Sequence, residues 1–285
     1  MRLPVDLQYR ITDREFNLLR DLIKELTGIN LSDQKKMLVV SRLSKRLRAL
    51  GLPDFTSYVK YIAEDEAGSQ EIDHLINRMT TNKTDFYRES HHFAFLTDVL
   101  LPELYGEGVK IGSRKLRVWS AGCSSGEEPY TIAITLREFF KDKSGWDIKI
   151  LATDLDTEML DKARKGIYTE QIVHPVPTQY LHRYFKKGVG SNQGLFLVKD
   201  ELKEMVIFRR HNLVSEPLLI KSPFDIIFCR NVIIYFDDAT KGSVIRRFHG
   251  ALKSGGYLFL GHSESLMGSE SRFKLISNST YRKGS

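Results

Sequence analysis

Cysteine is scarce in this chain, and long hydrophobic runs are missing from it. The 285 residues include two cysteines, Cys123 and Cys229, which lie far apart and form neither a metal-ligand spacing nor a disulfide framework. No apolar run approaches the roughly 20 residues that a membrane-spanning helix needs. The first residues carry no apolar core of the kind found in signal peptides. We therefore expect a cytoplasmic protein in a reducing compartment, without membrane insertion.

The composition also lacks the extremes that mark disordered, collagen-like and coiled-coil proteins. Hydrophobic residues make up 41% and charged residues 28%, which is ordinary for a globular protein. A net charge of +7 is mild for this length, so it permits an acidic partner without requiring nucleic acid. The length predicts one large domain or two modest ones.

The first 80 or so residues show only helical periodicity. Helices are expected over residues 13–26, 33–50, 54–63 and 70–79, with Gly28 and Gly51 ending the first two. We predict an N-terminal helical domain over residues 1–85. An apolar stripe marks one side of its second helix, and basic residues fall on the opposite side: Lys35, Arg42, Lys45 and Arg46.

Strands and helices alternate in the rest of the chain. Strands are expected at residues 116–120, 148–152, 206–208, 224–229 and 257–260. Helices are expected between them at residues 130–140, 156–165 and 240–252. A hairpin is expected at residues 273–283. This order predicts an α/β domain with a doubly wound, mostly parallel sheet over residues 86–285.

One segment interrupts the alternation. Residues 172–204 contain short apolar stretches and glycines, among them Gly188 and Gly190, where an unstructured loop would be unusually long. We expect a small antiparallel β-subdomain inserted into the α/β domain.

The strongest motif runs from a strand through a glycine turn into a helix, at residues 118–130. Its glycines, Gly122 and Gly126, do not follow the pattern that pyrophosphate usually requires. Glu127 and Glu128 oppose an anion and suit a cationic or zwitterionic ligand. They could also complement the helix dipole, which we favour for Glu127.

Two further strand ends carry polar residues. Asp154 closes the second strand, where a carboxylate can bind both ribose hydroxyls; a helix N-cap is the alternative, and we favour ribose. Arg230, Asn231 and Tyr235 follow the strand at residues 224–229 and should line the crevice. Tyr235 could instead lie in the core, and Asn231 could cap a turn. The glycine turn and Asp154 together indicate adenosine without phosphate.

These segments together resemble one enzyme family. The sequences SAGCSSGEEPY, ATDLD, HNL (His211 to Leu213) and FCRNVIIYF, with the linker at residues 80–89, are similar to the chemotaxis receptor methyltransferases, the CheR family. The resemblance covers nearly the whole chain. It implies a Rossmann-like, S-adenosylmethionine-dependent protein-glutamate O-methyltransferase that esterifies chemoreceptor glutamates for adaptation and releases S-adenosylhomocysteine.

The resemblance also implies roles for individual residues. The cofactor-binding residues would be Asn82, Thr84, Arg88, Glu128, Asp154, Asn212, Leu213, Arg230 and Asn231, with no metal. Arg88 and Tyr235 would lie nearest the incoming glutamate. Because a glutamate carboxylate is already ionised at neutral pH, no general base is needed. We expect Arg88 to orient the substrate and Tyr235 to fix its angle.

The implied partners are parts of a chemoreceptor. The basic helix would face the receptor's cytoplasmic helical bundle, although a solvated surface is equally open. The inserted β-subdomain would bind a C-terminal receptor tail by β-augmentation, unless its hairpin is purely structural. Nothing in the sequence indicates an obligate dimer, so we expect a monomer.

The sequence disfavours three alternative functions. A nucleic-acid methyltransferase of the amino-group type would carry an Asn/Asp-Pro-Pro-aromatic turn, whereas residues 230–233 contain no proline. A dinucleotide oxidoreductase lacks its glycine pattern here. A receptor-docking adaptor without activity is disfavoured, because every matched cofactor position holds a suitable polar residue.

Overall fold

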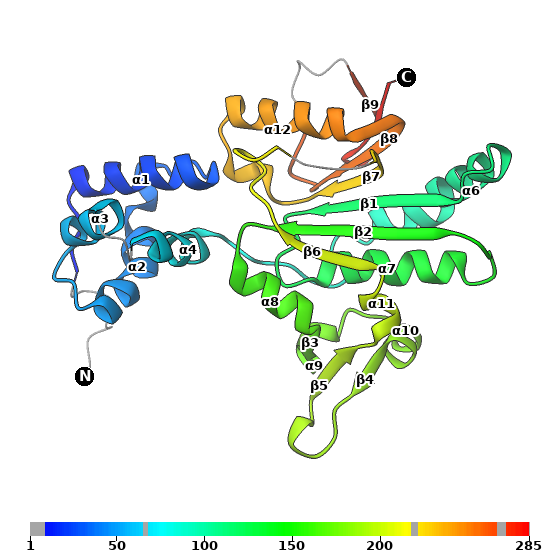
Figure 1. The fold of residues 1–285 in the computed structure, drawn as a ribbon, viewed down its shortest axis with the longest axis horizontal. Helices are drawn as coiled ribbons and strands as arrows, with labels where there is room; N and C mark the ends of the chain where they lie inside the picture. The colour runs from blue at the N-terminus through cyan, green and yellow to red at the C-terminus, as the bar shows by residue number, and fades with distance from the viewer. Residues whose placement is uncertain (1–8, 65–67, 218–221, 267–271, 285) are drawn as a thin grey trace. The chain divides into compact units, whose positions relative to one another are not determined.

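The computed structural model describes residues 9–64, 68–217, 222–266 and 272–284, and they form two compact units (Figure 1). The helical unit comprises Met1–Thr81 with Leu155–Thr157 and Tyr235–Gly242. The sheet unit comprises Asn82–Asp154, Glu158–Ile234 and Ser243–Ser285. The predicted α/β class, with its helical N-terminal part and small antiparallel sheet, is confirmed.

The helical unit is built from amphipathic helices with well-defined ends. Its helices are α1 (Asp13–Thr27), α2 (Lys36–Leu50) after a 3-10 turn (Asp33–Lys35), α3 (Phe55–Glu64) and α4 (Gly68–Met79). Thr12 and Glu15 form a reciprocal capping box at the start of α1. The predicted stops at Gly28 and Gly51 are confirmed, since both adopt left-handed backbone, with φ of +77° and +67°.

Arg42 and Arg46 on α2 are used inside the helical unit. Arg42 Nη1 donates to the main-chain oxygens of Met79 (2.7 Å) and Thr80 (3.0 Å). Arg46 Nε donates to Glu71 on α4 at 2.9 Å, and the Glu71 side chain is only 2% exposed. Arg42 and Arg46 therefore stabilise the packing of α4 against α2. The other two basic residues of the predicted face, Lys35 and Lys45, are exposed.

We predict that Arg46→Met lowers the free energy of unfolding by about 3 kcal/mol, because it leaves the buried Glu71 carboxylate without its cation. The matched variant Lys45→Met should change it by less than about 0.5 kcal/mol, since surface substitutions cost little. Urea denaturation of the full chain, followed by circular dichroism, measures both values. Equal effects of the two variants would show that Arg46 is not structural.

The sheet unit contains a seven-stranded sheet in the order β6-β2-β1-β7-β8-β10-β9. Its strands are β1 (Lys115–Ala121), β2 (Asp147–Asp154), β6 (Val206–Arg210), β7 (Phe224–Cys229), β8 (Leu252–Leu260), β9 (Phe273–Ser277) and β10 (Thr280–Lys283). The first five are parallel, and the β9–β10 hairpin adds two antiparallel strands at one edge. The predicted strands and closing hairpin are thus confirmed.

The strand order reverses direction between β1 and β7. From β1 the chain continues through α7 (Glu127–Phe140) to β2 on one side, and from β7 through α12 (Asp238–Ala251) to β8 on the other. Right-handed crossovers in opposite directions put helices on both faces of a sheet. In accord with this, Trp119 of β1 packs edge-on against Phe248 of α12, with ring centroids 5.2 Å apart, while Tyr130 of α7 packs against Phe208 of β6. The crevice outside the carboxyl ends of β1 and β7 is therefore the expected ligand site.

A small antiparallel sheet interrupts the α/β order between α8 (Thr157–Lys165) and β6, as expected. Its order is β3-β5-β4, with strands β3 (Ile167–Thr169), β5 (Leu195–Val198) and β4 (Phe185–Lys187). Short helices α9 (Glu170–Val173), α10 (Thr178–Tyr184) and α11 (Asp200–Lys203) and a 3-10 turn (Gly190–Asn192) connect the strands. The sheet begins at β3, five residues before the predicted start of the insertion at 172.

The helices between the linker and β1 were not predicted from the sequence. They are α5 (His91–Phe95), a π-helical turn η3 (Leu96–Leu100) and α6 (Leu101–Lys110). Phe93, Leu96 and Leu100 lie in the core of the sheet unit. This segment therefore belongs to the packed domain and positions the linker that precedes it.

Candidate functional site

The turn between β1 and α7 requires glycine at two positions. Gly122 and Gly126 have φ of +86° and +99°, which L side chains rarely adopt. A Cβ on Gly122 would lie 2.4 Å from Cγ2 of Val232, in the turn that follows β7. The glycine therefore lets the turns after β1 and β7 approach each other at the point where the strand order reverses.

Asp154 is bound to the same glycine turn. Its Oδ2 accepts a hydrogen bond from the Ser124 main-chain N–H at 2.7 Å, and Ser124 has φ of +47°. The carbonyl of Thr153 accepts from the N–H groups of Gly122 (2.8 Å) and Cys123 (2.9 Å). The end of β2 and the turn after β1 thus form one hydrogen-bonded structure, with a carboxylate in it.

The linker contacts this turn through Asn82. The Ser124 hydroxyl donates to the Asn82 main-chain oxygen at 3.1 Å. Thr84, two residues farther along, is half-buried. These two predicted linker residues therefore lie in the sheet unit, with Asn82 directly beside the glycine turn.

Two of the residues predicted to bind the cofactor, Asn212 and Leu213, follow β6. The His211 N–H donates to the Asp154 main-chain oxygen at 3.1 Å, which brings this segment to the end of β2. Asn212 is buried, and its Oδ1 accepts from the Val214 N–H at 2.9 Å. Leu213 is half-buried next to it. The structure therefore brings Asp154, Asn212 and Leu213 together.

The Glu128 side chain is buried, and both of its carboxylate oxygens accept hydrogen bonds. Its Oε1 accepts from the Ser120 hydroxyl at 2.7 Å, and its Oε2 accepts from Arg230 Nε at 2.8 Å. The side chains of Glu128 and Arg230 are 8% and 3% exposed. This ion pair joins the start of α7 to the end of β7 beneath the crevice.

Arg230 also holds the linker. Its Nη1 donates to the main-chain oxygen of Arg88 at 2.7 Å and lies 3.1 Å from His92 Nδ1. The Arg88 side chain bends back, and its Nη1 donates to the Lys83 main-chain oxygen at 2.7 Å. Arg230 thus fixes the backbone of Arg88, so we assign it a positioning role beside the predicted contact with the cofactor.

His92 is neutral in this arrangement. Burial, followed by the charge of Arg230, lowers the pKa of His92 to about 4. Its Nε2 lies 3.0 Å from the Asn278 carbonyl, so Nε2 carries the proton and Nδ1 accepts from Arg230. The imidazole thereby links Arg230 to the β9–β10 hairpin.

Glu127 is a buried acid in the first turn of α7, where it can complement the helix dipole. It is 3% exposed and accepts hydrogen bonds from the Ser125 hydroxyl at 2.8 and 3.0 Å. Burial raises the pKa of Glu127 to about 7. The carboxyl group of Glu127 is therefore partly protonated at neutral pH and lies at the amino end of α7.

We predict a pH-dependent effect of Glu127→Gln on stability. Because the folded-state pKa of Glu127 is raised from 4.5 to about 7, folding carries a cost that grows as the pH rises through this interval. The variant should gain up to about 3 kcal/mol of unfolding free energy over the wild type at pH 8, and less than about 0.5 kcal/mol at pH 4.5. Urea denaturation of both proteins at each pH measures the difference, and a pH-independent difference would contradict it.

Asn231 and Tyr235 have different surroundings. Asn231 has φ of +59°; its N–H donates to Glu264 at 2.8 Å and its Nδ2 to Glu89 at 3.4 Å. Tyr235 belongs to the helical unit, where its carbonyl accepts from the Asn30 N–H at 2.8 Å. Asn231 therefore lies at the crevice of the sheet unit, whereas Tyr235 belongs to the helical unit.

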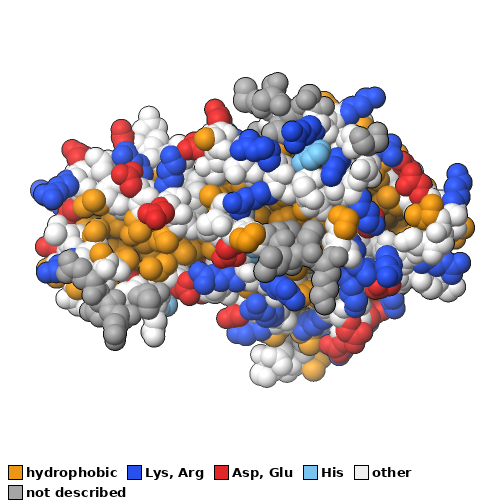
Figure 2. Space-filling view, turned by 45° about the horizontal axis from the view of Figure 1, so that its top comes forward, with side chains coloured by type: hydrophobic (Ala, Val, Ile, Leu, Met, Phe, Trp, Pro, Cys, Tyr) orange, Lys and Arg blue, Asp and Glu red, His pale blue; other side chains and the backbone are white. Residues whose placement is uncertain are grey.

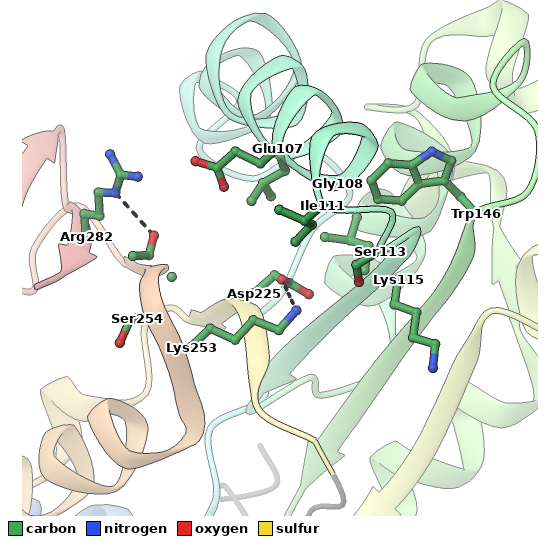
Figure 3. A pocket seen from close by; sticks show the side chains of 14 residues that line it. Glu107, Gly108, Ile111, Ser113, Lys115, Trp146, Asp225, Lys253, Ser254 and Arg282 are labelled. Atoms are coloured by element: carbon green, nitrogen blue, oxygen red, sulfur yellow. Dashed lines mark hydrogen bonds and ion pairs between the residues drawn. The ribbon is translucent and has the colours of Figure 1, made fainter. Parts of the chain in front are cut away.

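A hollow of about 260 Å³ lies at the amino ends of the parallel strands, away from the crevice at their carboxyl ends (Figure 3). Three of its charged groups form ion pairs: Lys253 pairs with Asp225 at 2.5 Å, and Arg282 pairs with Glu103, outside the lining, at 2.8 Å. Asp225 also accepts from the Arg117 N–H at 2.7 Å. Because the hollow lies at the amino ends of the parallel strands, it is not the expected ligand crevice.

Within the described ranges, no group of three or more His, Cys, Asp or Glu side chains is placed to bind a metal ion. Across those ranges, no helix is both long and apolar enough to cross a membrane. On the face shown in Figure 2, Lys and Arg side chains are interspersed with Asp and Glu rather than joined in one basic area.

Comparison with known proteins decides the family. The family model described as "CheR methyltransferase, SAM binding domain" matches residues 82–282, and "CheR methyltransferase, all-alpha domain" matches residues 14–80. The chain belongs to the CheR methyltransferase family. A chemotaxis protein methyltransferase of Borreliella burgdorferi is 40% identical over 98% of this chain and 97% of its own. One of Escherichia coli is 43% identical over 95% and 91%, respectively.

Membership of the CheR family confirms S-adenosylmethionine as the cofactor, and the crevice suits it. This cofactor supplies a methyl group on a positively charged sulfonium. Three carboxylates, those of Glu127, Glu128 and Asp154, surround the glycine turn, where a phosphate would be repelled. The donor and acceptor groups present therefore fit a cationic nucleoside without phosphate.

Four residues of this CheR site were missed by the sequence argument: Glu89, His92, His262 and Glu264. Glu89 is the last residue of the linker, and His92 lies in the unpredicted helix α5. His262 and Glu264 come directly after β8, and the rule that strand carboxyl ends line the crevice would have identified them. Glu264 binds the N–H groups of Asn231 (2.8 Å) and Gly261 (2.6 Å) and so fixes the turn after β7.

Proposed function

We propose that this protein transfers a methyl group from S-adenosylmethionine to glutamate side chains of chemoreceptors. The observation that carries the proposal is the Glu128–Arg230 pair, which holds the backbone of Arg88 at the crevice of a CheR SAM-binding domain. The CheR relatives are named chemotaxis protein methyltransferases and match this chain over nearly its whole length. The reaction takes place in the cytoplasm.

The chemistry needs positioning rather than proton transfer. A substrate glutamate is ionised at neutral pH and is itself the nucleophile. The guanidinium of Arg88 binds one carboxylate oxygen and leaves the other directed at the methyl carbon. Asp154 binds the ribose, Asn212 and Leu213 contact the adenine, and Asn82, Thr84, Glu128 and Asn231 complete the cofactor site. Tyr235 fixes the angle of the substrate carboxylate.

The test is methyl transfer from labelled S-adenosylmethionine to a purified chemoreceptor. The expected product is a labelled receptor that releases its label as methanol in mild alkali, as carboxyl methyl esters do. A catalytically silent adaptor would bind the receptor without labelling it. Label that resists alkali would indicate methylation of an amine or amide.

We also propose that the small sheet binds the receptor's C-terminal tail. Strand β5 is central, so β3 and β4 are the edges, and an extended peptide can pair with a free edge. On β4, Lys186 and Lys187 are exposed. A fluorescent tail peptide should bind the protein in anisotropy titrations, and full turnover on a receptor lacking its tail would overturn this role.

Contact with the receptor's helical bundle would use the exposed Lys35 and Lys45 rather than all four basic residues. Arg42 and Arg46 instead donate hydrogen bonds to α4, at the main-chain oxygen of Met79 and at the side chain of Glu71. The enzyme acts as a monomer. Double charge reversal of Lys35 and Lys45 should raise the KM for receptor, and sedimentation should give the mass of one chain.

A further inference from the structure

The small antiparallel sheet is packed against the glycine turn of the cofactor site. It lies on the α7 side of the seven-stranded sheet (Figure 1). Tyr168, the middle residue of β3, pairs with Phe196 of β5. Its hydroxyl donates to the Ser125 carbonyl at 2.7 Å, and the residue is only 3% exposed. A side chain of the small sheet therefore holds the turn that joins β1 to α7.

The Ser125 carbonyl lies outside the helical hydrogen bonds of α7. Gly126 is the N-cap, and its carbonyl accepts the first helical hydrogen bond, from the Tyr130 N–H at 3.1 Å. A helix that began one residue earlier would need an N–H at position 129, where proline has none. Burial raises the pKa of the Tyr168 phenol well above its usual range, so the hydroxyl stays protonated and donates. The phenol therefore supplies a partner that the helix cannot supply.

Tyr168 is in close contact with the turn as well as hydrogen-bonded to it. A Cβ on Gly126 would lie 2.8 Å from the Tyr168 hydroxyl oxygen and 2.9 Å from Cβ of Ala163. The phenol oxygen thus fills the space beside the turn and limits where the turn can move. The hydrogen bond and the close packing act on two consecutive residues, Ser125 and Gly126.

The ring of Tyr168 also supports the linker. It packs edge-on against Phe86, with ring centroids 5.0 Å apart, and Phe86 packs against Phe185 of β4 at 5.8 Å. Phe86 is 1% exposed. The linker also meets the turn at Asn82, whose main-chain oxygen accepts from the Ser124 hydroxyl. The glycine turn and the linker, which both belong to the predicted cofactor site, are therefore packed on one tyrosine of the small sheet.

We propose that Tyr168 is a positioning residue for S-adenosylmethionine, whose hydroxyl holds the glycine turn in the conformation that binds the cofactor. It acts through Ser125 rather than on the reacting groups. Because the turn is held before the cofactor arrives, binding carries less of the cost of ordering it. The inference rests on the proposed function, because it concerns the cofactor of the same reaction. It gives the small sheet a role besides the proposed binding of a receptor tail.

The test compares the affinity of the wild type and of Tyr168→Phe for S-adenosylhomocysteine by calorimetry. Phenylalanine keeps the ring against Phe86 and removes only the hydroxyl. We expect the Kd to rise about 5-fold, the change that loss of one hydrogen bond commonly produces. In receptor methylation the KM for S-adenosylmethionine should rise by a similar factor. The kcat should stay within about 2-fold, because Arg88 keeps its main-chain bond to Arg230.

Tyr184→Phe is the matched control. Tyr184 belongs to α10 of the same insertion and is 3% exposed, and its hydroxyl donates at 2.7 Å to Glu138 rather than to the glycine turn. Both variants lose one buried hydroxyl, so both should lower the free energy of unfolding in urea denaturation. Tyr184→Phe should nevertheless bind S-adenosylhomocysteine with wild-type affinity. The affinity therefore separates positioning from a merely structural contribution.

The outcomes separate this inference from the proposed function. Wild-type affinity in Tyr168→Phe would overturn the inference alone, and so would an equal loss of affinity in both variants. A wild-type chain that does not bind S-adenosylhomocysteine would overturn both. A wild-type chain that binds it but leaves receptor unmethylated would overturn the proposed function, while weaker binding by Tyr168→Phe would still support the positioning role.

Discussion

Replacing Asp154 with alanine should weaken S-adenosylhomocysteine binding at least about 100-fold. The carboxylate binds the Ser124 N–H at 2.7 Å, and in the proposed complex it also accepts both ribose hydroxyls. Hydrogen bonds to a charged group contribute about 1.5–3 kcal/mol each, so losing two ligand bonds corresponds to this change in Kd. Calorimetric titration of the full chain measures the effect.

Two further variants show whether the loss of S-adenosylhomocysteine affinity is specific to the Asp154 carboxylate. Asp154→Asn keeps an acceptor for the Ser124 N–H and should bind better than Asp154→Ala, but more weakly than the wild type. Asp161→Ala removes an exposed carboxylate of α8, which pairs with Arg164 at the surface, and should bind as the wild type does. Wild-type affinity in Asp154→Ala would remove Asp154 from the cofactor site.

Replacing Arg88 with alanine should lower kcat for receptor methylation about 10²–10³-fold, as removal of one positioned donor commonly does. The reason is that the substrate carboxylate loses the fork that orients it against the methyl group. The backbone at residue 88 should stay in place, because Arg230 holds its main-chain oxygen rather than its side chain. Initial rates at saturating receptor and cofactor measure this change.

The control for Arg88→Ala is Arg164→Ala, which removes an exposed guanidinium and should leave kcat unchanged. Arg88→Lys should recover only part of the rate, because an ammonium group keeps the charge but lacks the rigid, planar donor geometry that orients the carboxylate. Full turnover of Arg88→Ala with wild-type cofactor affinity would show that Arg88 does not orient the substrate.

Much of this architecture could be predicted from local patterns. Alternating apolar stretches identified the five parallel strands, and the glycines ended α1 and α2 where predicted. The helices over residues 91–110 were missed. The π-helical turn at Leu96–Leu100 shifts the apolar positions out of simple helical spacing, and long-range packing onto the sheet stabilises the segment.

The residues of the candidate site that lie at strand ends could be predicted from the sequence. Residues whose role depends on a partner that is distant in the sequence could not. Asp154 is the last residue of β2 and Glu128 lies in the first turn of α7, so the topology brings both to the crevice. Arg46 looked like a surface cation because its partner Glu71 lies 25 residues away on another helix. Likewise, the neutral state of His92 depends on Arg230 and Asn278, which no local pattern connects to it.

The most direct test of the central claim is to map the methyl groups on a chemoreceptor by tandem mass spectrometry. The receptor would be incubated with this protein and S-adenosylmethionine carrying a deuterated methyl group. The account predicts deuterated methyl esters on glutamate side chains, absent when Asp154→Ala replaces the wild type. Unmodified receptor, or methyl groups on residues other than glutamate, would contradict it.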